Sequence, residues 1–166
     1  MIAAAFLLLV VSLLIGSFTK PEFPPYELGP HADSTYTLDA SRGDVWLWWR
    51  GVGFRRNHVI AEPGGGALDL GPVAFDSISA IPADAAYEAT SFMGDTTNAA
   101  FGKWYDYSMW SHLLTSKHHV YAVRTAAGEF AKLEILAYYC RQVGPGCYTI
   151  RYKAVRPRPA SSGARN

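Results

Sequence analysis

The chain has 166 residues, of which 49% are hydrophobic, 14% are aromatic and 17% are charged. This length suits one domain, and an aromatic-rich chain with so few charges is not intrinsically disordered. Fifteen basic and fourteen acidic side chains leave a net charge of +1, which excludes the strong positive field typical of nucleic-acid-binding proteins, so we expect no nucleic-acid partner.

The first segment, residues 2–18, reads IAAAFLLLVVSLLIGSF and contains no charged side chain. As a helix it would rise about 25 Å, close to the ~30 Å hydrocarbon core of a bilayer. A cleaved secretory signal normally carries basic residues ahead of its apolar run, and none precedes this one. The alternative is an uncleaved anchor.

Residues 14–17, Leu-Ile-Gly-Ser, are similar to the signal box of bacterial lipoproteins, with Ser17 in place of the lipid-accepting cysteine. Without a thiol this position cannot be acylated. We therefore expect residues 1–18 to form a retained transmembrane helix that contacts the lipid bilayer through residues 2–18.

Residues 19–30 contain four prolines and no periodicity, which predicts an extended linker. The next part of the chain, 31–154, is expected to form a β domain, because ten Tyr, eight Phe and five Trp accompany many glycines and prolines. Its first predicted strands are 34–39, 44–49 and 54–61, followed by two short β-like pieces within 67–80. Residues 95–98, Asp-Thr-Thr-Asn, are expected to cap a short helix that ends at Trp104.

The strongest pattern is a β-hairpin formed by residues 120–125 and 129–140 around an Ala-Ala-Gly turn. In its second strand, small, aliphatic and aromatic residues alternate with Lys132 and Glu134, the period-2 pattern of a half-buried strand. Residues 147–154 are predicted to add a third strand. The last residues, 155–166, lack core-forming side chains and are expected to be a flexible basic tail.

Cys140 and Cys147 are the two cysteines of the chain, and a Gly-Pro-Gly turn lies between them. Such a turn places the two side chains opposite each other across a hairpin, so we expect a disulfide and an oxidising compartment. The alternative is a pair of free buried thiols. With the predicted helix, this places the β domain on the periplasmic side of a bacterial inner membrane, as a single-pass protein.

Several segments resemble the HmuY-like haem-binding family. These are YAVRTAAGEFAKLEILAYY (121–139), YTIRY (148–152), GFRRN (53–57), VAFD (73–76) and WYDY (104–107). The resemblance covers roughly residues 34–154 and implies an all-β domain of stacked antiparallel sheets with few helices, secreted in most cases as a lipoprotein. Two departures are that Trp49 is followed by Arg50 and Gly51 rather than by an aspartate, and that the lipoprotein cysteine is Ser17. The family's iron ligands do not map residue by residue onto this chain.

Haem b is the cofactor that this resemblance would imply, and its iron needs axial ligands held in an apolar, aromatic cleft. The candidate ligands are histidines, and the favoured pair is His112 with His118 or His119; His58 is a third option. Adjacent residues of a strand point to opposite faces, so His118 and His119 would not both face one pocket. The alternative, which the sequence favours, is that these histidines are ordinary surface or hydrogen-bonded residues and that the chain has no cofactor.

The sequence contains no catalytic motif, metal-binding spacing or phosphate loop, so we do not expect an enzyme or a metal site. Its excess of aromatic residues suits a core or a protein interface, with interface candidates Trp46, Trp48, Trp49, Trp104, Tyr105 and Trp110. Arg55 and Arg56 could bind a propionate or a phosphate, although neighbouring arginines on a strand more often form a solvated face.

Two functions follow from these features. The favoured one is a non-enzymatic structural subunit, anchored by one helix, whose β domain packs on the integral subunits of a larger bacterial membrane complex, for example a photosynthetic reaction-centre/antenna or respiratory assembly. The alternative is a membrane-anchored haem-capture protein of the HmuY-like type.

Overall fold

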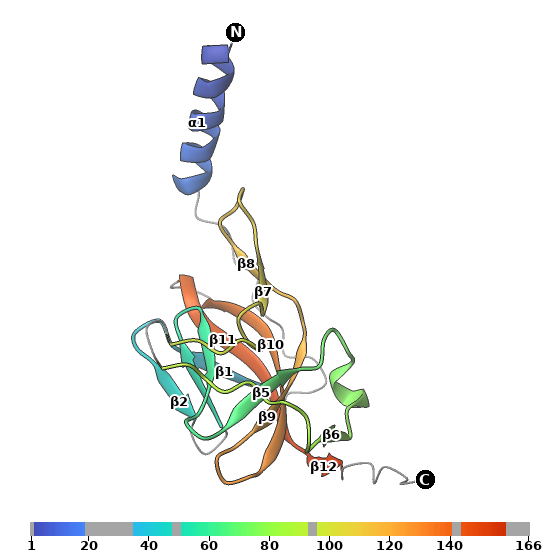
Figure 1. The fold of residues 1–166 in the computed structure, drawn as a ribbon. Helices are drawn as coiled ribbons and strands as arrows, with labels where there is room; N and C mark the ends of the chain where they lie inside the picture. The colour runs from blue at the N-terminus through green and yellow to red at the C-terminus, as the bar shows by residue number, and fades with distance from the viewer. Residues whose placement is uncertain (1, 19–34, 48–50, 93–95, 141–143, 159–166) are drawn as a thin grey trace.

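The computed structural model describes residues 2–18, 35–47, 51–92, 96–140 and 144–158. It contains one α-helix, α1, and a β domain with a single short 3₁₀ turn at Phe75–Ser77 among the described residues (Figure 1). The strands, in chain order, are β1 (Thr35–Asp39), β2 (Val45–Leu47), β3 (Val52–Arg55), β4 (His58–Ala61), β5 (Gly66–Asp69), β6 (Ala80–Pro82), β7 (Tyr105–Tyr107), β8 (Leu114–Ser116), β9 (Val120–Arg124), β10 (Phe130–Cys140), β11 (Gly144–Ala154) and β12 (Arg156–Arg158). The predicted all-β architecture of this domain is confirmed.

Helix α1 (Ile2–Phe18) coincides with the apolar N-terminal segment. Within the described part of the chain, no helix is both long and apolar enough to cross a membrane. The structure therefore does not support the transmembrane span predicted for residues 1–18, and the bilayer contact predicted through residues 2–18 stays a prediction. Helix α1 has 17 residues and rises about 25 Å, which is shorter than the ~30 Å bilayer core. The predicted linker, 19–30, lies outside the described residues.

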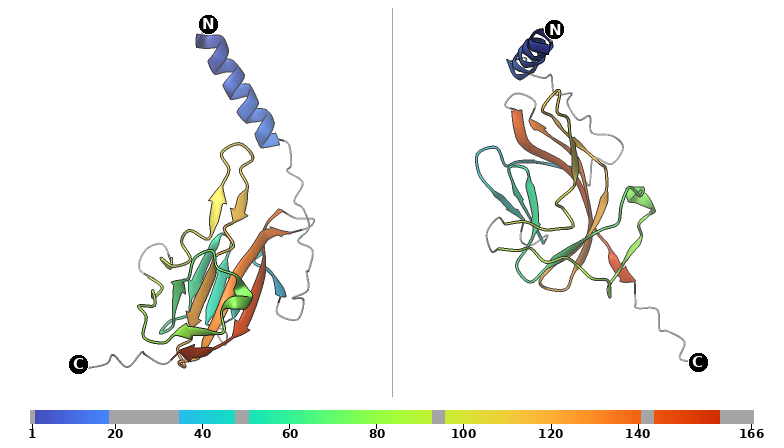
Figure 2. Two further views of the ribbon diagram at one scale, coloured as in Figure 1. Left: turned by 90° about the vertical axis from the view of Figure 1, so that its right-hand side faces the viewer. Right: turned by 45° about the horizontal axis from the view of Figure 1, so that its top comes forward.

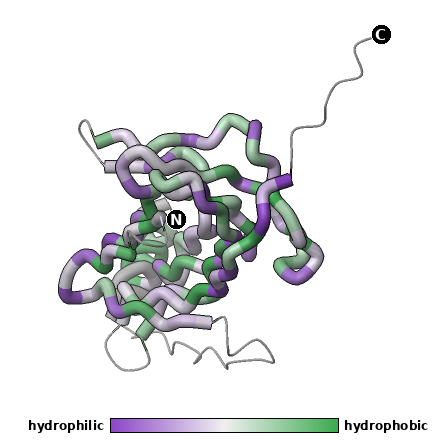
Figure 3. Tube along the Cα trace, turned by 90° about the horizontal axis from the view of Figure 1, so that it is seen from below, coloured by the Kyte–Doolittle hydropathy of each residue, from purple (hydrophilic) through white to green (hydrophobic). Residues whose placement is uncertain are grey.

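The main sheet has five strands in the order β1-β11-β10-β9-β5, and all of its pairs are antiparallel. The hairpin predicted from residues 120–140 forms its centre as β9 and β10, and β11 continues the meander as predicted. A smaller sheet, β2-β3-β4, packs on one face of it. There the Phe54 and Tyr148 rings lie 5.0 Å apart between their centroids. Hydrophobic and hydrophilic residues alternate along the trace of this domain (Figure 3).

The predicted single strand 54–61 is instead the β3–β4 hairpin, in which Arg55 pairs with His58 across a two-residue turn. Arg56 adopts a positive φ of 25°, a conformation that closes tight turns and that the apolar pattern of the strand does not reveal. The helix predicted from Asp95 to Trp104 is also wrong for the described residues 96–104, which form turns. Asn98, one of the predicted capping residues, accepts hydrogen bonds at its side-chain carbonyl from the backbone N–H groups of Ala100 and Phe101, but it caps a turn rather than a helix.

Strand β10 carries register shifts after Ile135 and after Ala137. Before the first shift the buried core-facing residues are Ala131, Leu133 and Ile135, and beyond it the core residue is Tyr138. A bulge inserts one residue and so moves the following side chains to the other face. The strict alternation predicted for this strand therefore holds only as far as Ile135; beyond it Tyr138 is buried in the core and Tyr139 packs against the core from a partly buried position.

The opposite face of the main sheet is covered rather than half-exposed. Lys132, with 3% of its surface exposed, donates hydrogen bonds to the backbone carbonyls of Phe75 and Ile78 at 2.5 and 2.7 Å. Arg151 forms an ion pair of 2.8 Å with Asp76, and both cations lie over the Phe75 ring. Burial lowers the pKa of Lys132 and raises the pKa of the neighbouring Glu134. These contacts hold the 3₁₀ turn on the sheet.

Two short pairings complete the domain. Strand β12 pairs in parallel with β6 through Arg156, Pro157 and Arg158, so the predicted flexible tail is wrong for these three residues, since backbone pairing does not need apolar side chains. The β7–β8 hairpin projects from the other end of the domain (Figures 1 and 2).

Candidate functional site

The projecting β7–β8 hairpin carries one of the candidate haem ligands, His112, in its turn. The turn is closed by hydrogen bonds from the Ser108 N–H to the Leu113 carbonyl and from the His112 N–H to the Ser108 carbonyl, at 2.9 and 2.8 Å. Next to the turn, the Leu114 N–H donates to the Tyr139 hydroxyl at 2.6 Å. At the base of the hairpin, the Lys117 N–H donates to the Trp104 carbonyl at 3.0 Å. The hairpin is thus fixed to the domain while its tip is presented to solvent.

At this tip the Nδ1 atom of His112 is hydrogen-bonded to the Tyr107 hydroxyl, and the two ring centroids lie 5.9 Å apart. When Nδ1–H donates to the hydroxyl oxygen, Nε2 carries the lone pair that binds a metal. The neighbouring Met109 and Trp110 are 67% and 73% exposed, and Tyr107 is exposed as well. The tip therefore combines an oriented imidazole with accessible apolar surface.

The other candidate histidines lie elsewhere and face different partners. The Nδ1 atom of His118 lies 3.3 Å from a carboxylate oxygen of Glu134 on β10, and Nδ1 of His119 lies 2.9 Å from a carboxylate oxygen of Asp69 on β5. His112 lies in the turn before strand β8, whereas His118 and His119 follow that strand and contact carboxylates of the main sheet. Their pairing on one iron stays a prediction. His58 begins β4 on a different hairpin.

The predicted disulfide between Cys140 and Cys147 is present, with Cα atoms 4.9 Å apart. It joins the end of β10 to β11 across the Gly-Pro-Gly segment. Asp39 also lies within 4.8 Å of the two sulfur atoms. Because both sulfur atoms are bonded to each other, this group is not a metal site.

The interface candidates separate into buried and exposed side chains. Trp104 has 2% of its surface exposed and packs on Tyr105, Tyr138 and Tyr148, so its assignment to an interface is wrong. Tyr105 is half-buried beside it, whereas Trp46 and Trp110 are exposed. Trp48 and Trp49 lie outside the described residues.

The aromatic cluster under the hairpin predicts an alkaline transition. Burial raises the pKa of Tyr138 to about 12, and it also raises the pKa values of Tyr148 and Tyr121. The buried tyrosines have higher pKa values in the folded state than in the unfolded state, where the usual value is about 10. Their contribution to the free energy of unfolding is therefore fully present below about pH 10 and decreases as the pH rises further. In a titration followed by tyrosinate absorbance, we expect the exposed tyrosines to ionise first and the buried ones only with unfolding. A single transition near pH 10 for all tyrosines would contradict this.

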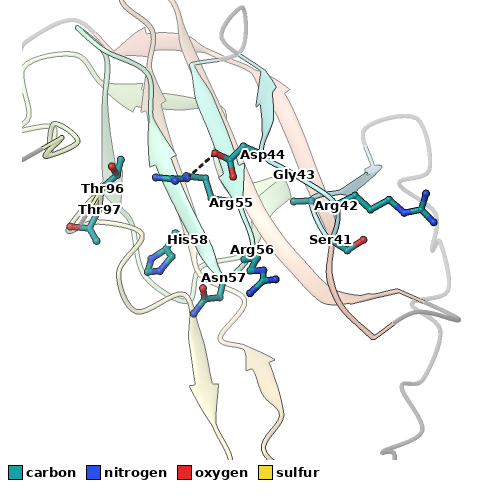
Figure 4. Close-up of a pocket in the computed structure, with 11 residues that line it drawn as sticks. Ser41, Arg42, Gly43, Asp44, Arg55, Arg56, Asn57, His58, Thr96 and Thr97 are labelled. Atoms are coloured by element: carbon teal, nitrogen blue, oxygen red, sulfur yellow. Dashed lines mark ion pairs between the residues drawn. The ribbon is translucent and has the colours of Figure 1, made fainter. Parts of the chain in front are cut away.

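A pocket of about 570 Å³ lies at the other hairpin, between the β3–β4 turn, the β1–β2 connection and the segment with Thr96 and Thr97 (Figure 4). Its described lining residues are mostly polar or charged: Ala40, Ser41, Arg42, Gly43, Asp44, Arg55, Arg56, Asn57, His58, Thr96 and Thr97. The Arg55 Nε atom lies 2.9 Å from a carboxylate oxygen of Asp44. Sequence reasoning singled out Arg55, Arg56 and His58 but missed the pocket, because residues from three distant segments form it.

With this geometry established, the chain can be compared with known proteins. No protein-family profile matches it, and no curated protein matches it. Solved structures do match its fold. A predicted lipoprotein from Bacteroides fragilis NCTC 9343 is 15% identical, with a TM-score of 0.55 over 75% of this chain and 91% of that one.

Two further solved structures share the fold. The apo form of an HmuY analog from Tannerella forsythia is 13% identical, with a TM-score of 0.53 over 75% of this chain and 80% of that one. Apo PinO from Porphyromonas gingivitis is 18% identical, with a TM-score of 0.52 over 64% of each chain. The β domain therefore has an HmuY-like fold. At these identities the comparison establishes the fold alone.

Proposed function

We propose that this chain is a non-enzymatic haem-binding protein in which His112 of the β7–β8 hairpin binds the iron. The observation that carries the proposal is the pairing of His112 with Tyr107 at a projecting, apolar tip. A hydrogen bond on Nδ1 fixes the ring orientation and raises the basicity of Nε2, as is usual for metal-binding histidines. The HmuY-like fold of the β domain is compatible with haem binding, and the choice of His112 as ligand rests on the hairpin geometry alone.

The surroundings of His112 suit a porphyrin better than those of the other histidines do. Tyr107, Met109 and Trp110 offer exposed aromatic and thioether surface that a flat, apolar ligand would cover. His118 and His119 are engaged with carboxylates, and His58 lies in a polar pocket. In this proposal His112 is the protein imidazole that would hold the iron.

An extracytoplasmic location is part of this proposal. The Cys140–Cys147 disulfide is of the kind that persists in oxidising compartments. The similar structure from Bacteroides fragilis, a predicted lipoprotein, supports the same location.

Haemin titration of the purified full-length chain tests the proposal. We expect a Soret band sharper than that of free haemin, its loss in His112→Ala and a several-fold weaker affinity in Tyr107→Phe. The matched controls His118→Ala and His119→Ala should retain the band, because these histidines lie on other elements. A band that survives His112→Ala, or that His119→Ala abolishes, would contradict the assignment.

A second candidate function is that of a non-enzymatic accessory subunit of a larger bacterial membrane complex. It is favoured by the exposure of Trp110 and Met109, since aromatic and methionine side chains are enriched at protein interfaces. The haemin experiment separates the two candidates. A free-haem spectrum, together with stoichiometric co-purification of the chain with such a complex, would favour the subunit role.

A further inference from the structure

The polar pocket of Figure 4 has a fixed cationic wall on the β3–β4 hairpin. Arg55 extends toward Thr96 and Thr97, on the side where His58 lies, while the Arg42 side chain points away from this group (Figure 4). Arg56 follows Arg55 directly, and among the described residues no carboxylate forms an ion pair with Arg56. The charges of Arg55 and Asp44 offset each other in their ion pair. The net positive charge of this wall therefore comes from Arg56.

The wall is held in place from several directions. The Asp44 carboxylate binds Nε of Arg55 at 2.9 Å, which orients the guanidinium and leaves its terminal amino groups for a ligand. Trp104 Nε1–H donates to the Asn57 carbonyl at 3.2 Å and so ties the turn to the core. Arg56 adopts its positive φ in the same turn. A non-glycine residue in this conformation needs support from its surroundings, and such residues are concentrated at ligand sites.

The opposite wall supplies neutral hydrogen-bonding groups. The hydroxyls of Thr96 and Thr97 lie across from Arg55, and Asn57 contributes an amide. The volume of about 570 Å³ falls within the range of small-molecule sites, roughly 300–1,000 Å³. The polar lining does not suit a porphyrin, whereas guanidinium groups match the geometry of carboxylates and phosphates.

We propose that this pocket binds a sugar-sized organic anion, with its carboxylate or phosphate on Arg55 and its other polar groups on Arg56, Asn57, Thr96 and Thr97. The site is separate from the hairpin tip that carries His112, so it does not depend on haem binding. Asp44 acts as a positioning residue, because it touches Arg55 rather than the ligand.

Calorimetric titration of the full-length chain at low salt tests this site, with glucuronate, glucose 6-phosphate and glucose as probes. We expect saturable binding of one or both anions, no binding of neutral glucose, and weaker binding as salt screens the charges. Preference for glucuronate would identify the anionic group as a carboxylate, and preference for glucose 6-phosphate would identify it as a phosphate.

Variants then assign the binding to the pocket. Arg55→Gln and Arg56→Gln should each lower the affinity by about tenfold or more, as expected for the loss of a charge-assisted hydrogen bond. Arg158→Gln, which removes an exposed arginine of β12, is the matched control and should bind as the wild type does. Arg56 lies in a turn rather than in a strand, so we expect Arg56→Gln to fold. This variant can therefore test the site even if Arg55→Gln destabilises the protein. Three results would overturn the proposal: binding of glucose as tight as that of the anions, no binding of either anion, or equal weakening by Arg158→Gln. Unchanged haemin binding in the arginine variants would show that the two sites are independent.

Discussion

Replacement of Trp104 by alanine should lower the free energy of unfolding by about 3–5 kcal/mol, the range for deletion of a large buried aromatic side chain. The indole is among the largest fully buried side chains and touches the rings of Tyr105, Tyr138 and Tyr148. Its loss leaves a cavity between the two sheets and removes the hydrogen bond to the Asn57 carbonyl. Thermal unfolding followed by circular dichroism should show a drop in Tm on the order of 10 °C.

Trp110→Ala is the matched control for that experiment, since it deletes the same side chain from a position that is 73% exposed. A surface substitution of this kind should change stability by less than about 0.5 kcal/mol. Equal losses in the two variants would contradict the assignment of Trp104 to the core and of Trp110 to the surface. The Trp104 variant should also weaken anion binding, because the β3–β4 turn loses its tie to the core.

Removal of the disulfide in the double variant Cys140→Ser and Cys147→Ser should cost about 2–3 kcal/mol of stability. The bond closes a short loop, with a sequence separation of seven, so the loss of unfolded-state entropy that it causes is at the low end for disulfides. Both cysteines are buried, and serine hydroxyls in their place would also lack the sulfur atoms' packing. Denaturant unfolding of the variant and of the oxidised wild type measures the difference.

Reduction of the wild-type protein provides the control for the disulfide variant. The reduced protein and the double serine variant should unfold at similar denaturant concentrations, both below the oxidised protein. If the reduced and oxidised forms unfold together, the disulfide does not stabilise the fold and its use as an indicator of compartment is weakened.

Local sequence patterns were sufficient for the centre of the fold. The alternation in residues 129–140 and the Ala-Ala-Gly turn correctly predicted strands β9 and β10, and the third strand and the disulfide were also predicted correctly. The Gly-Pro-Gly segment, predicted to be a turn, instead forms the first residues of β11, where Gly144 pairs with Cys140. These features depend on neighbours in the chain. A period of two selects a strand, and a glycine-containing turn selects a hairpin whatever the rest of the molecule does.

Long-range packing decided the features that were predicted wrongly. Lys132 and Glu134 were predicted to face solvent, but both are buried. The Phe75–Ser77 turn covers Lys132, and Glu134 contacts His118 and Arg151. The bulges in β10 change which side chains face the core, and no local residue pattern marks their position. The tight turn at Arg56 was likewise hidden inside a strand-like run.

The candidate sites show the same division. The sequence by itself identified the histidines, the Arg55–Arg56 pair and an all-β domain, because residue types and strand periodicity are properties of the chain; the HmuY-like character of that domain came from a resemblance to a known family. Only the tertiary structure decided that His112 is oriented by Tyr107 while His118 and His119 face carboxylates. It also placed Arg55, His58 and Thr97 around one pocket. The reason is that a site forms where loops from distant segments meet. The packing of the sheets determines which loops meet, and local sequence patterns do not reveal that packing.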